Sequence, residues 1–251
     1  MPLAELSTDA LLDPAREFDA ELASLKGSLA APDFWHPHSN AADGLGILTA
    51  LRGECRDLGR ICGDGSVGVF GGNDGDLAFF LEAQGLHPSI VDDAATNYNR
   101  LAGAYRLKDA LRSGVEIRDV DLDGTPYVTG WYDLVFFLDR LFHYKNPYGA
   151  LERLAQRARY CLLSTRVMRA LPEKAFGVRE YPMAYLLDAH ESGGDSTCTW
   201  VFTETGLRRL ALRAGWSVVE YASAGNLIDS DPVSGDGVER AFVLLRSGLY
   251  G

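Results

Sequence analysis

The chain has 251 residues, of which 47% are hydrophobic, and its 35 acidic side chains exceed its 24 basic ones to give a formal net charge of -11. A chain of this length and composition can bury one substantial core. The negative balance repels phosphate backbones, so the composition argues against a nucleic-acid partner.

The sequence also argues against membranes and disulfides. No run of 18 or more apolar residues occurs, and the first residues carry Asp and Glu where a secretory signal needs a basic start. The four cysteines, Cys55, Cys62, Cys161 and Cys198, form no C-x-x-C pair, which favours free thiols in a reducing compartment. We therefore expect a soluble cytoplasmic protein.

The first 60 residues predict helices. A helix is expected over residues 13–29 and a loop over 30–44. A second helix should follow, because one stripe repeats apolar residues in steps of three and four, namely Leu48, Leu51, Cys55, Leu58 and Cys62. We interpret residues 1–60 as a helical cap on a main domain of residues 61–251.

From residue 66 onward, short apolar runs alternate with helical stretches, which is typical of β-α-β units and a mostly parallel sheet. The predicted strands cover residues 66–70, 88–92, 115–121, 132–138 and 160–167. A crossover helix over residues 145–159 is predicted from Asn146 as its N-cap and Pro147 in its first turn.

The C-terminal part predicts a long loop and a last helical and strand unit. Residues 168–200 lack a clear period and are too long for a plain connection, so we expect a lid or binding loop there. A helix follows between Thr203 as N-cap and Gly215 as C-cap, and residues 216–223 and 239–247 predict the closing strands.

The turn after the first predicted strand suggests a ligand site. Gly71, Asn73 and Gly75 give the spacing G-x-N-x-G before a helix over residues 76–84. In open α/β sheets, ligands bind beyond the carboxyl ends of the strands, where glycines allow close backbone approach. The next strand ends on Asp92 and Asp93, and a carboxylate there can accept both hydroxyls of a ribose. The expected ligand is a nucleoside.

Four segments together resemble class I S-adenosylmethionine-dependent methyltransferases. The closest group is the one related to the enzyme that modifies tRNA wobble uridine with a carboxymethyl group. The likeness covers roughly residues 33 to 246, and "LFHYKNP" is its most specific part; the segments are "GGNDGDLAFFLE", "SIVDDAATNYNR", "YDLVFFLDRLFHYKNPYGALERLAQRARYCLLSTRV" and "YPMAYLLD".

The resemblance implies a Rossmann-like α/β fold, with a seven-stranded sheet of order 3-2-1-4-5-7-6 whose last strand is antiparallel. It implies S-adenosylmethionine as the cofactor. The binding residues implied are Gly71, Asn73 and Gly75 at the methionine and ribose, Asp92 at the ribose hydroxyls, Val120 and Asp121 at the adenine, and Leu138 and Asp139 beside the sulfonium.

One position departs from the family pattern. Relatives carry an acidic residue two positions before the first glycine of the turn, and this chain has Val69 there. The missing carboxylate would have helped to orient the turn and the amino group of the cofactor. A fold that has lost its activity is therefore one alternative.

Candidate acceptor-side residues come from both halves of the chain. His143 follows the fourth strand and could act as a base, or it could hydrogen-bond the loop and shape the pocket. His36 and His38 flank Pro37 and could contact substrate or be structural. With no Cys or His partner placed near them, no metal site is expected there. Tyr144 could wall a pocket and Arg166 could grip an anionic group, unless it is salt-bridged.

These features predict a methyltransferase that acts on an oxygen or nitrogen of a small molecule. A transferase for tRNA wobble uridine and a noncatalytic binding protein are the alternatives. Association into a homodimer is left open.

Overall fold

The computed structural model describes residues 7–53, 57–63, 65–125, 127–172, 177–225, 230–233 and 239–249. Its contacts divide the chain into two compact units, Met1–Phe136 and Phe137–Gly251, which are described in turn. The predicted helical cap lies within the first unit. Its boundary at residue 60 stays a prediction.

The first unit contains a parallel sheet. Its strands are β1 (Ser66–Phe70), β2 (His87–Asp92), β3 (Glu116–Asp119) and the first part of β4 (Tyr132–Leu138), in the order β3-β2-β1-β4. Val69 is paired with Ile90 of β2 and with Phe136 of β4, so β1 is central. All four strands lie where the apolar runs predicted them, and their carboxyl ends share one edge of the sheet.

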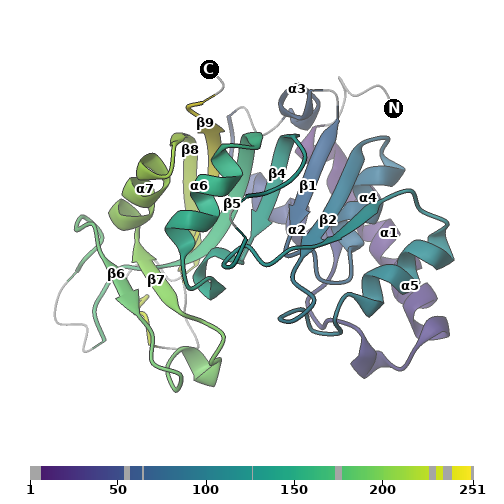
Figure 1. The fold of residues 1–251 in the computed structure, drawn as a ribbon, viewed down its shortest axis with the longest axis horizontal. Coiled ribbons are helices and arrows are strands. Elements are labelled where there is room, and N and C mark those ends of the chain that lie inside the picture. Colours follow the sequence, from purple (N-terminus) through teal and green to yellow (C-terminus); the bar gives the residue numbers. More distant parts are fainter. Residues whose placement is uncertain are drawn as a thin grey trace. The chain divides into compact units, whose positions relative to one another are not determined.

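Two helices connect these strands. Helix α4 (Asp76–Ala83) follows β1 and contacts β2, and α5 (Ala102–Leu111) follows β2 (Figure 1). The α4 sequence is apolar almost throughout because the helix is buried; Phe79, Phe80 and Leu81 are each at most 2% exposed. The start of α4 is therefore fixed firmly against the sheet.

Helix α1 (Thr8–Leu29) begins five residues before the predicted start at residue 13. Ser7 accepts a hydrogen bond from the Ala10 amide at 3.2 Å, and Leu11 adds a buried apolar residue to the first turns. Pro14 lies inside the helix. The predicted start at residue 13 was therefore wrong, because the capped first turns lie before Pro14.

The predicted second helix is wrong, because the structure divides that segment. It contains α2 (Ala41–Gly46), the 3-10 turn η3 (Ile47–Ala50) and α3 (Leu58–Cys62). Asp19 accepts hydrogen bonds from the first two amides of α2, and Asp57 caps α3 through the Arg60 amide at 3.0 Å. Each short helix thus has its own start signal. The predicted stripe is buried nevertheless at Leu48, Leu51, Leu58 and Cys62, whereas Cys55 lies outside the described residues.

The second unit is built around a long strand, β5 (Ala158–Met168). β5 pairs antiparallel with β9 (Glu239–Ser247), and β9 pairs antiparallel with β8 (Trp216–Gly225). In the predicted order, the seventh and last strand lies between the fifth and the sixth strand. The structure agrees, because the last strand, β9, lies between β5 and β8. The predicted Rossmann-like α/β fold, with parallel strands and an antiparallel last strand, is confirmed. The predicted number of seven strands is wrong, because the described residues form nine strands, of which β6 (Ala184–Leu186) and β7 (Trp200–Thr203) were not predicted.

The helices of the second unit begin at the predicted caps. Helix α6 (Pro147–Ala155) starts after Asn146, whose side-chain oxygen accepts the Gly149 amide at 2.9 Å. Helix α7 (Glu204–Arg213) starts after Thr203, which accepts the Gly206 amide at 3.0 Å. Both caps satisfy amides that would otherwise lack a partner in the helix.

The segment predicted as a lid contains regular structure that its sequence did not indicate. Strands β6 (Ala184–Leu186) and β7 (Trp200–Thr203) pair antiparallel, and β7 also pairs with the end of β5. The short 3-10 turns η5 (Leu141–His143) and η6 (Ser192–Gly194) complete the unit.

Two further predictions concern membranes and thiols. None of the helices in the described part of the chain is long and apolar enough to span a membrane. The three described cysteines, Cys62, Cys161 and Cys198, are free and buried, in agreement with the prediction of free thiols.

Candidate functional site

The turn between β1 and α4 has the backbone that the G-x-N-x-G spacing predicted. Gly71, Asn73 and Gly75 have φ angles of 70°, 54° and 93°, in the left-handed region that glycine adopts freely and asparagine tolerates. The Gly71 amide donates to the carbonyl of Val91 at 2.8 Å, which ties the turn to β2. The three residues therefore shape a tight corner at the carboxyl edge of the sheet.

Gly75 is required by packing as well as by its backbone angle. A Cβ atom there would lie 2.5 Å from Ile90 Cδ1 and 2.7 Å from Phe79 Cε2, which is closer than side chains tolerate. Gly75 is also the N-cap of α4. The absence of a side chain therefore lets α4 begin directly against β2.

Phe70, the bulky residue before the turn, packs within the sheet of the first unit. Its ring lies edge-on to Tyr132 with 5.6 Å between ring centroids, and Phe70 is 2% exposed. Gly68 makes room for it, because a Cβ atom at Gly68 would lie 2.7 Å from the Phe70 ring. The ring of Phe70 is thus directed toward Gly68 and Tyr132.

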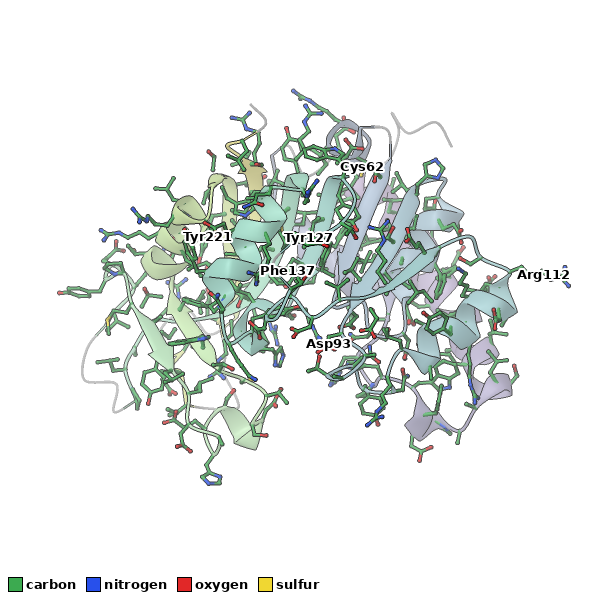
Figure 2. The ribbon with its side chains drawn as sticks, in the orientation of Figure 1. Cys62, Asp93, Arg112, Tyr127, Phe137 and Tyr221 are labelled. Atoms are coloured by element: carbon green, nitrogen blue, oxygen red, sulfur yellow. The ribbon has the colours of Figure 1, made fainter. Side chains whose placement is uncertain are left out.

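Asp92, at the end of β2, braces the turn. Its carboxylate accepts hydrogen bonds from the Asn73 amide at 3.3 Å, the Asp93 amide at 3.0 Å and Asn97 Nδ2 at 2.9 Å. Asp92 is 4% exposed. Figure 2 shows Asp93, which follows Asp92, at the opposite end of the strands of this unit from Cys62. Asp92 thus lies at the carboxyl edge, where the sequence placed the ribose carboxylate.

Asn97 and Asn99 of the "NYNR" segment connect three parts of the first unit. Asn97 Nδ2 also donates to the Asn73 carbonyl at 3.3 Å, and its Oδ1 accepts the Leu101 amide at 2.9 Å. Asn99 Nδ2 donates to Asp74 Oδ1 at 2.6 Å. These amides hold the turn, the end of β2 and the start of α5 together.

A buried ionic cluster next to the turn was missed in the sequence. Lys26 Nζ of α1 lies 2.6 Å from Asp76 Oδ1 and 3.7 Å from Asp74 Oδ2, and Ser39 Oγ donates to Asp76 Oδ2 at 2.5 Å. Both carboxylate side chains are at most 4% exposed. Burial raises the pKa of Asp76, and the Lys26 ammonium opposes that rise. The "NDGD" acids could have signalled the cluster, but nothing local pointed to a lysine 48 and 50 residues away.

The two candidate histidines of the N-terminal segment belong to the same neighbourhood. The His36 amide donates to Asp74 Oδ2 at 2.7 Å, and its ring packs edge-on against Tyr98 with 5.6 Å between centroids. His36 Nδ1 accepts the His38 amide at 3.2 Å, and His38 is exposed. His36 therefore has a structural role at the turn, and substrate contact by either ring stays a prediction.

Val120 and Asp121 follow β3. The Val120 amide donates to the Asp92 carbonyl at 2.9 Å, which places Val120 beside the end of β2. Asp121 is exposed, and its carboxylate accepts the Asp123 amide at 2.8 Å in a local turn. The adenine contacts implied for Val120 and Asp121 stay a prediction.

Val69 is buried at the position where relatives carry an acid. It is 5% exposed, and its Cγ1 would lie 3.3 Å from a Cβ atom at Gly72. The nearest acid along the turn, Asp74, is fully buried and bonded to His36 and Asn99. The described part of the turn therefore offers no replacement carboxylate at position 69.

The second unit holds the remaining candidates. Asp139 has a φ angle of 52°, its amide donates to Ser164 Oγ at 2.9 Å, and its carboxylate pairs with Arg240. Leu138 is half-buried at the end of β4. Their predicted place beside the sulfonium stays a prediction.

His143 lies in η5 and is held by the segment before β7. Its Nδ1 is 3.0 Å from Thr197 Oγ1. Burial and the positive charge of Arg140 lower the pKa of His143, while Thr197 and Asp195 oppose that effect. The neighbouring candidate, Tyr144, packs its ring on Phe137 with 5.5 Å between centroids.

Arg166 is 6% exposed and its guanidinium is engaged by the protein. It donates to Ser192 Oγ at 2.6 Å and to the Asp231 carbonyl at 2.8 Å. These bonds give Arg166 a structural role in joining β5 to the η6 segment. Binding of an anionic substrate by Arg166 stays a prediction.

Comparison with known proteins finds a likeness in fold and none in sequence family. No protein-family model matches the chain, and no curated protein does. Among solved structures, the N-terminal domain of EvdMO1 with SAH bound has a TM-score of 0.55 and 17% identity, over 88% of this chain and 84% of that one. The same domain in the presence of SAH and D-fucose has a TM-score of 0.57 and 16% identity, over 92% and 96%.

A third structure extends the likeness to nearly the whole chain. The [4+2]-cyclase SpnF has a TM-score of 0.58 and 13% identity, over 98% of both chains. At such identities the likeness concerns the fold alone, which is a Rossmann-like α/β fold. The narrower resemblance to the tRNA wobble-uridine group stays a prediction.

Proposed function

We propose that this protein is an S-adenosylmethionine-dependent methyltransferase that acts on an oxygen or nitrogen of a small molecule. The observation that carries the proposal is the turn after β1, in which Gly71, Asn73 and Gly75 are left-handed and Asp92 holds the Asn73 amide. In this class of sheet, such a corner lies at the edge where ligands bind. The SAH in the EvdMO1 structure supports the choice of ligand.

The cofactor fits the residues of the first unit in part. Gly71, Asn73 and Gly75 would line its methionine and ribose, Asp92 would meet the ribose hydroxyls, and Val120 with Asp121 would flank the adenine. Phe70 packs toward Tyr132, so its ring does not oppose this arrangement. Position 69 does not fit, because buried Val69 offers nothing to the amino group of the cofactor.

The reaction needs positioning and one proton acceptor. When bound, S-adenosylmethionine supplies an electrophilic methyl group on its sulfonium. The residues of this chain would have to hold the acceptor atom in line with that methyl group, exclude water, and take the proton that the acceptor loses. We propose His143 as the group that takes this proton. Thr197 at Nδ1 fixes its ring, so the transfer would use Nε2.

Calorimetry tests the binding step directly. We expect heat on titration with S-adenosylmethionine and with S-adenosylhomocysteine, and none with adenosine triphosphate, whose triphosphate has no basic partner in the turn. No heat at millimolar ligand would retire the proposal. Once binding is measured, His143→Gln should lower kcat while cofactor affinity stays the same, and an equal loss of affinity would assign His143 to structure instead.

A noncatalytic or non-methylating protein is the second candidate, and Val69 favours it. SpnF also shows that a protein of this fold can be a cyclase. A comparison of Val69→Asp with the isosteric control Val69→Asn separates the candidates. Tight binding by the unchanged protein, with no gain in Val69→Asp, supports an intact enzyme. A large gain in Val69→Asp alone indicates a decayed site.

The tRNA alternative has a separate test. A transferase for wobble uridine must bind tRNA, and its binding should weaken steeply with salt. The net charge of -11 leads us to expect no shift of tRNA in a native gel at low salt. A specific shift would favour the tRNA reading over a small acceptor.

A further inference from the structure

Three side chains with different ligand chemistry meet in the second unit. They are His143 of η5 and, from the segment between η6 and β7, Asp195 and Cys198. One ligand atom from each side chain lies within 4.8 Å of the ligand atoms of the other two. Among the described residues, this is the one group of three or more such side chains close enough to hold a metal ion. The cluster brings together a nitrogen, an oxygen and a sulfur donor.

The two segments that supply these side chains are tied together by other bonds. The Thr199 amide donates to the Phe142 carbonyl at 2.7 Å, and Trp200 Nε1 donates to the Lys145 carbonyl at 3.3 Å. Thr197 Oγ1 also donates to Asp195 Oδ1 at 2.6 Å. The cluster is therefore positioned by backbone and side-chain contacts that a metal ion would not need to create.

We propose that His143, Asp195 and Cys198 bind a divalent metal ion of the zinc type. Imidazole, carboxylate and thiolate are the donors that zinc takes in proteins, and three protein ligands with an open position are typical of its reactive sites. A thiolate in the set argues against magnesium and calcium, which prefer oxygen ligands. The ligand class is thus a thiophilic first-row ion.

The surrounding charges make the thiolate essential. Arg140 lies near His143 and Arg166 lies near Cys198, so both guanidinium groups oppose an incoming cation. Cys198 Sγ donates to Asp195 Oδ2 at 3.3 Å. On binding, the metal would replace this proton, which passes to solvent, and the new sulfur–metal bond would offset the repulsion. A metal ion that binds thiolate weakly would not gain enough binding energy to offset the repulsion by the two guanidinium groups.

A simpler structural role for Cys198 gives a different expectation. The side chain is 9% exposed and packs in an apolar cluster with Met168, Val178, Leu187 and Val201. As a core cysteine, Cys198 would be insensitive to metal. The proposed metal site goes beyond the proposed methyl transfer and does not rest on it. It is an alternative to the base role of His143, because a histidine that binds a metal cannot also take the proton of the acceptor.

Cobalt(II) titration tests the site without any assay of activity. The full-length metal-free protein should bind one cobalt ion with a thiolate-to-cobalt charge-transfer band in the near ultraviolet, and zinc should displace it. Cys198→Ser should abolish the band and weaken zinc binding at least tenfold, and Asp195→Asn should weaken zinc binding while keeping the band. The matched control is His190→Gln, an exposed histidine of the same unit, which should bind as the unchanged protein does.

Two outcomes would overturn the site: absence of stoichiometric cobalt or zinc binding, and a band that survives in Cys198→Ser. If Cys198→Ser does not fold, alkylation of the unchanged protein replaces it. Zinc should then protect Cys198 from iodoacetamide under conditions that open the core, while buried Cys161 is labelled equally with and without zinc. Equal labelling of Cys198 in both samples contradicts the proposal.

Discussion

Lys26 lies between two buried carboxylates, Asp74 of the turn after β1 and Asp76 at the start of α4, and its side chain is 11% exposed. A buried ion pair is weak evidence for stability by itself, but removal of one partner leaves an uncompensated charge. In this unit the charge left behind would belong to Asp76 and Asp74. The lysine therefore matters through the acids that it neutralises.

Lys26→Met should lower the free energy of unfolding by about 3 kcal/mol at neutral pH. Asp76 already has a raised pKa, and the loss of Lys26 raises it further. A carboxyl with a raised folded-state pKa contributes stability at low pH that is lost as the pH rises through that pKa. The deficit of Lys26→Met should therefore shrink as the pH falls. Urea denaturation at several pH values measures it.

The control for Lys26→Met is Arg16→Ala, which breaks the exposed pair between Arg16 and Asp13. An exposed pair contributes about 0–1 kcal/mol, so this variant should be close to neutral. Equal effects of the two substitutions, or a deficit that does not change with pH, would contradict the role given to Lys26.

At the scale of elements, the glycines on either side of α4 allow the cost of backbone strain to be measured apart from the cost of packing. Gly75 and Gly85 have φ angles of 93° and 88°. A Cβ atom at Gly75 would clash with Ile90 and Phe79. A Cβ atom at Gly85 would have no heavy atom of the described residues within 4 Å, apart from its chain neighbours. An alanine would therefore carry a similar backbone penalty at both positions, but its side chain would have room only at Gly85.

Gly85→Ala should cost roughly 1–2 kcal/mol, the penalty of a left-handed alanine. Gly75→Ala should cost roughly 1–3 kcal/mol more, since the core must also shift. Gly75→Ala should in addition lower cofactor affinity, which Gly85→Ala should not. Urea denaturation and calorimetry measure both effects, and equal losses in the two variants would show that packing at the turn is unimportant.

Thr203 joins the start of α7 to the segment before β6. Its hydroxyl accepts the amides of Gly206 and Met183 and donates to the Tyr181 carbonyl at 2.5 Å. Thr203 is fully buried, so an apolar replacement leaves buried partners unpaired. The cap therefore also anchors part of the predicted lid.

Thr203→Val should lower the free energy of unfolding by about 2 kcal/mol, while Thr203→Ser, which keeps the hydroxyl, should lose less than half of that. Hydrogen exchange should also show faster opening at Tyr185 and Leu186 in Thr203→Val. If Thr203→Ser is as unstable as Thr203→Val, the methyl group rather than the hydroxyl supplies the stability.

The elements show where sequence reasoning succeeds. β1 and β4 were predictable because their apolar runs are buried on both faces, and α6 because Asn146 and Pro147 mark its start. The 46–62 segment was misread because buried residues in several short helices can imitate one stripe. β6 could not be predicted, since its ends depend on pairing with Trp200 and Phe202 far along the chain.

For the candidate site the limit is similar. Gly71, Asn73 and Asp92 follow local rules of strand ends and left-handed turns, so their placement could be read from the sequence. The bonds from Lys26 to Asp76 and from Thr197 to His143 join residues 50 and 54 positions apart. No local period records such distances, and these contacts became visible only in the structure.

At the scale of the whole molecule, ligand binding should appear as thermal stabilisation. At a concentration of 100 times its Kd, S-adenosylhomocysteine should add about 2.7 kcal/mol, which raises Tm by roughly 5–10 °C for a chain of this size. Differential scanning fluorimetry measures the shift. Adenosine triphosphate is the control, and an unchanged Tm at millimolar S-adenosylhomocysteine would count against the proposed function.

The bond from Lys26 to Asp76 has a consequence for engineering. A designer who grafts the β1–α4 corner into another scaffold, or trims the protein to begin after Leu29, would carry two anions without their cation. In the transplanted corner, the carboxylates of Asp74 and Asp76 would repel each other without Lys26 and would destabilise the turn. Such a graft should include α1, or replace both acids with amides.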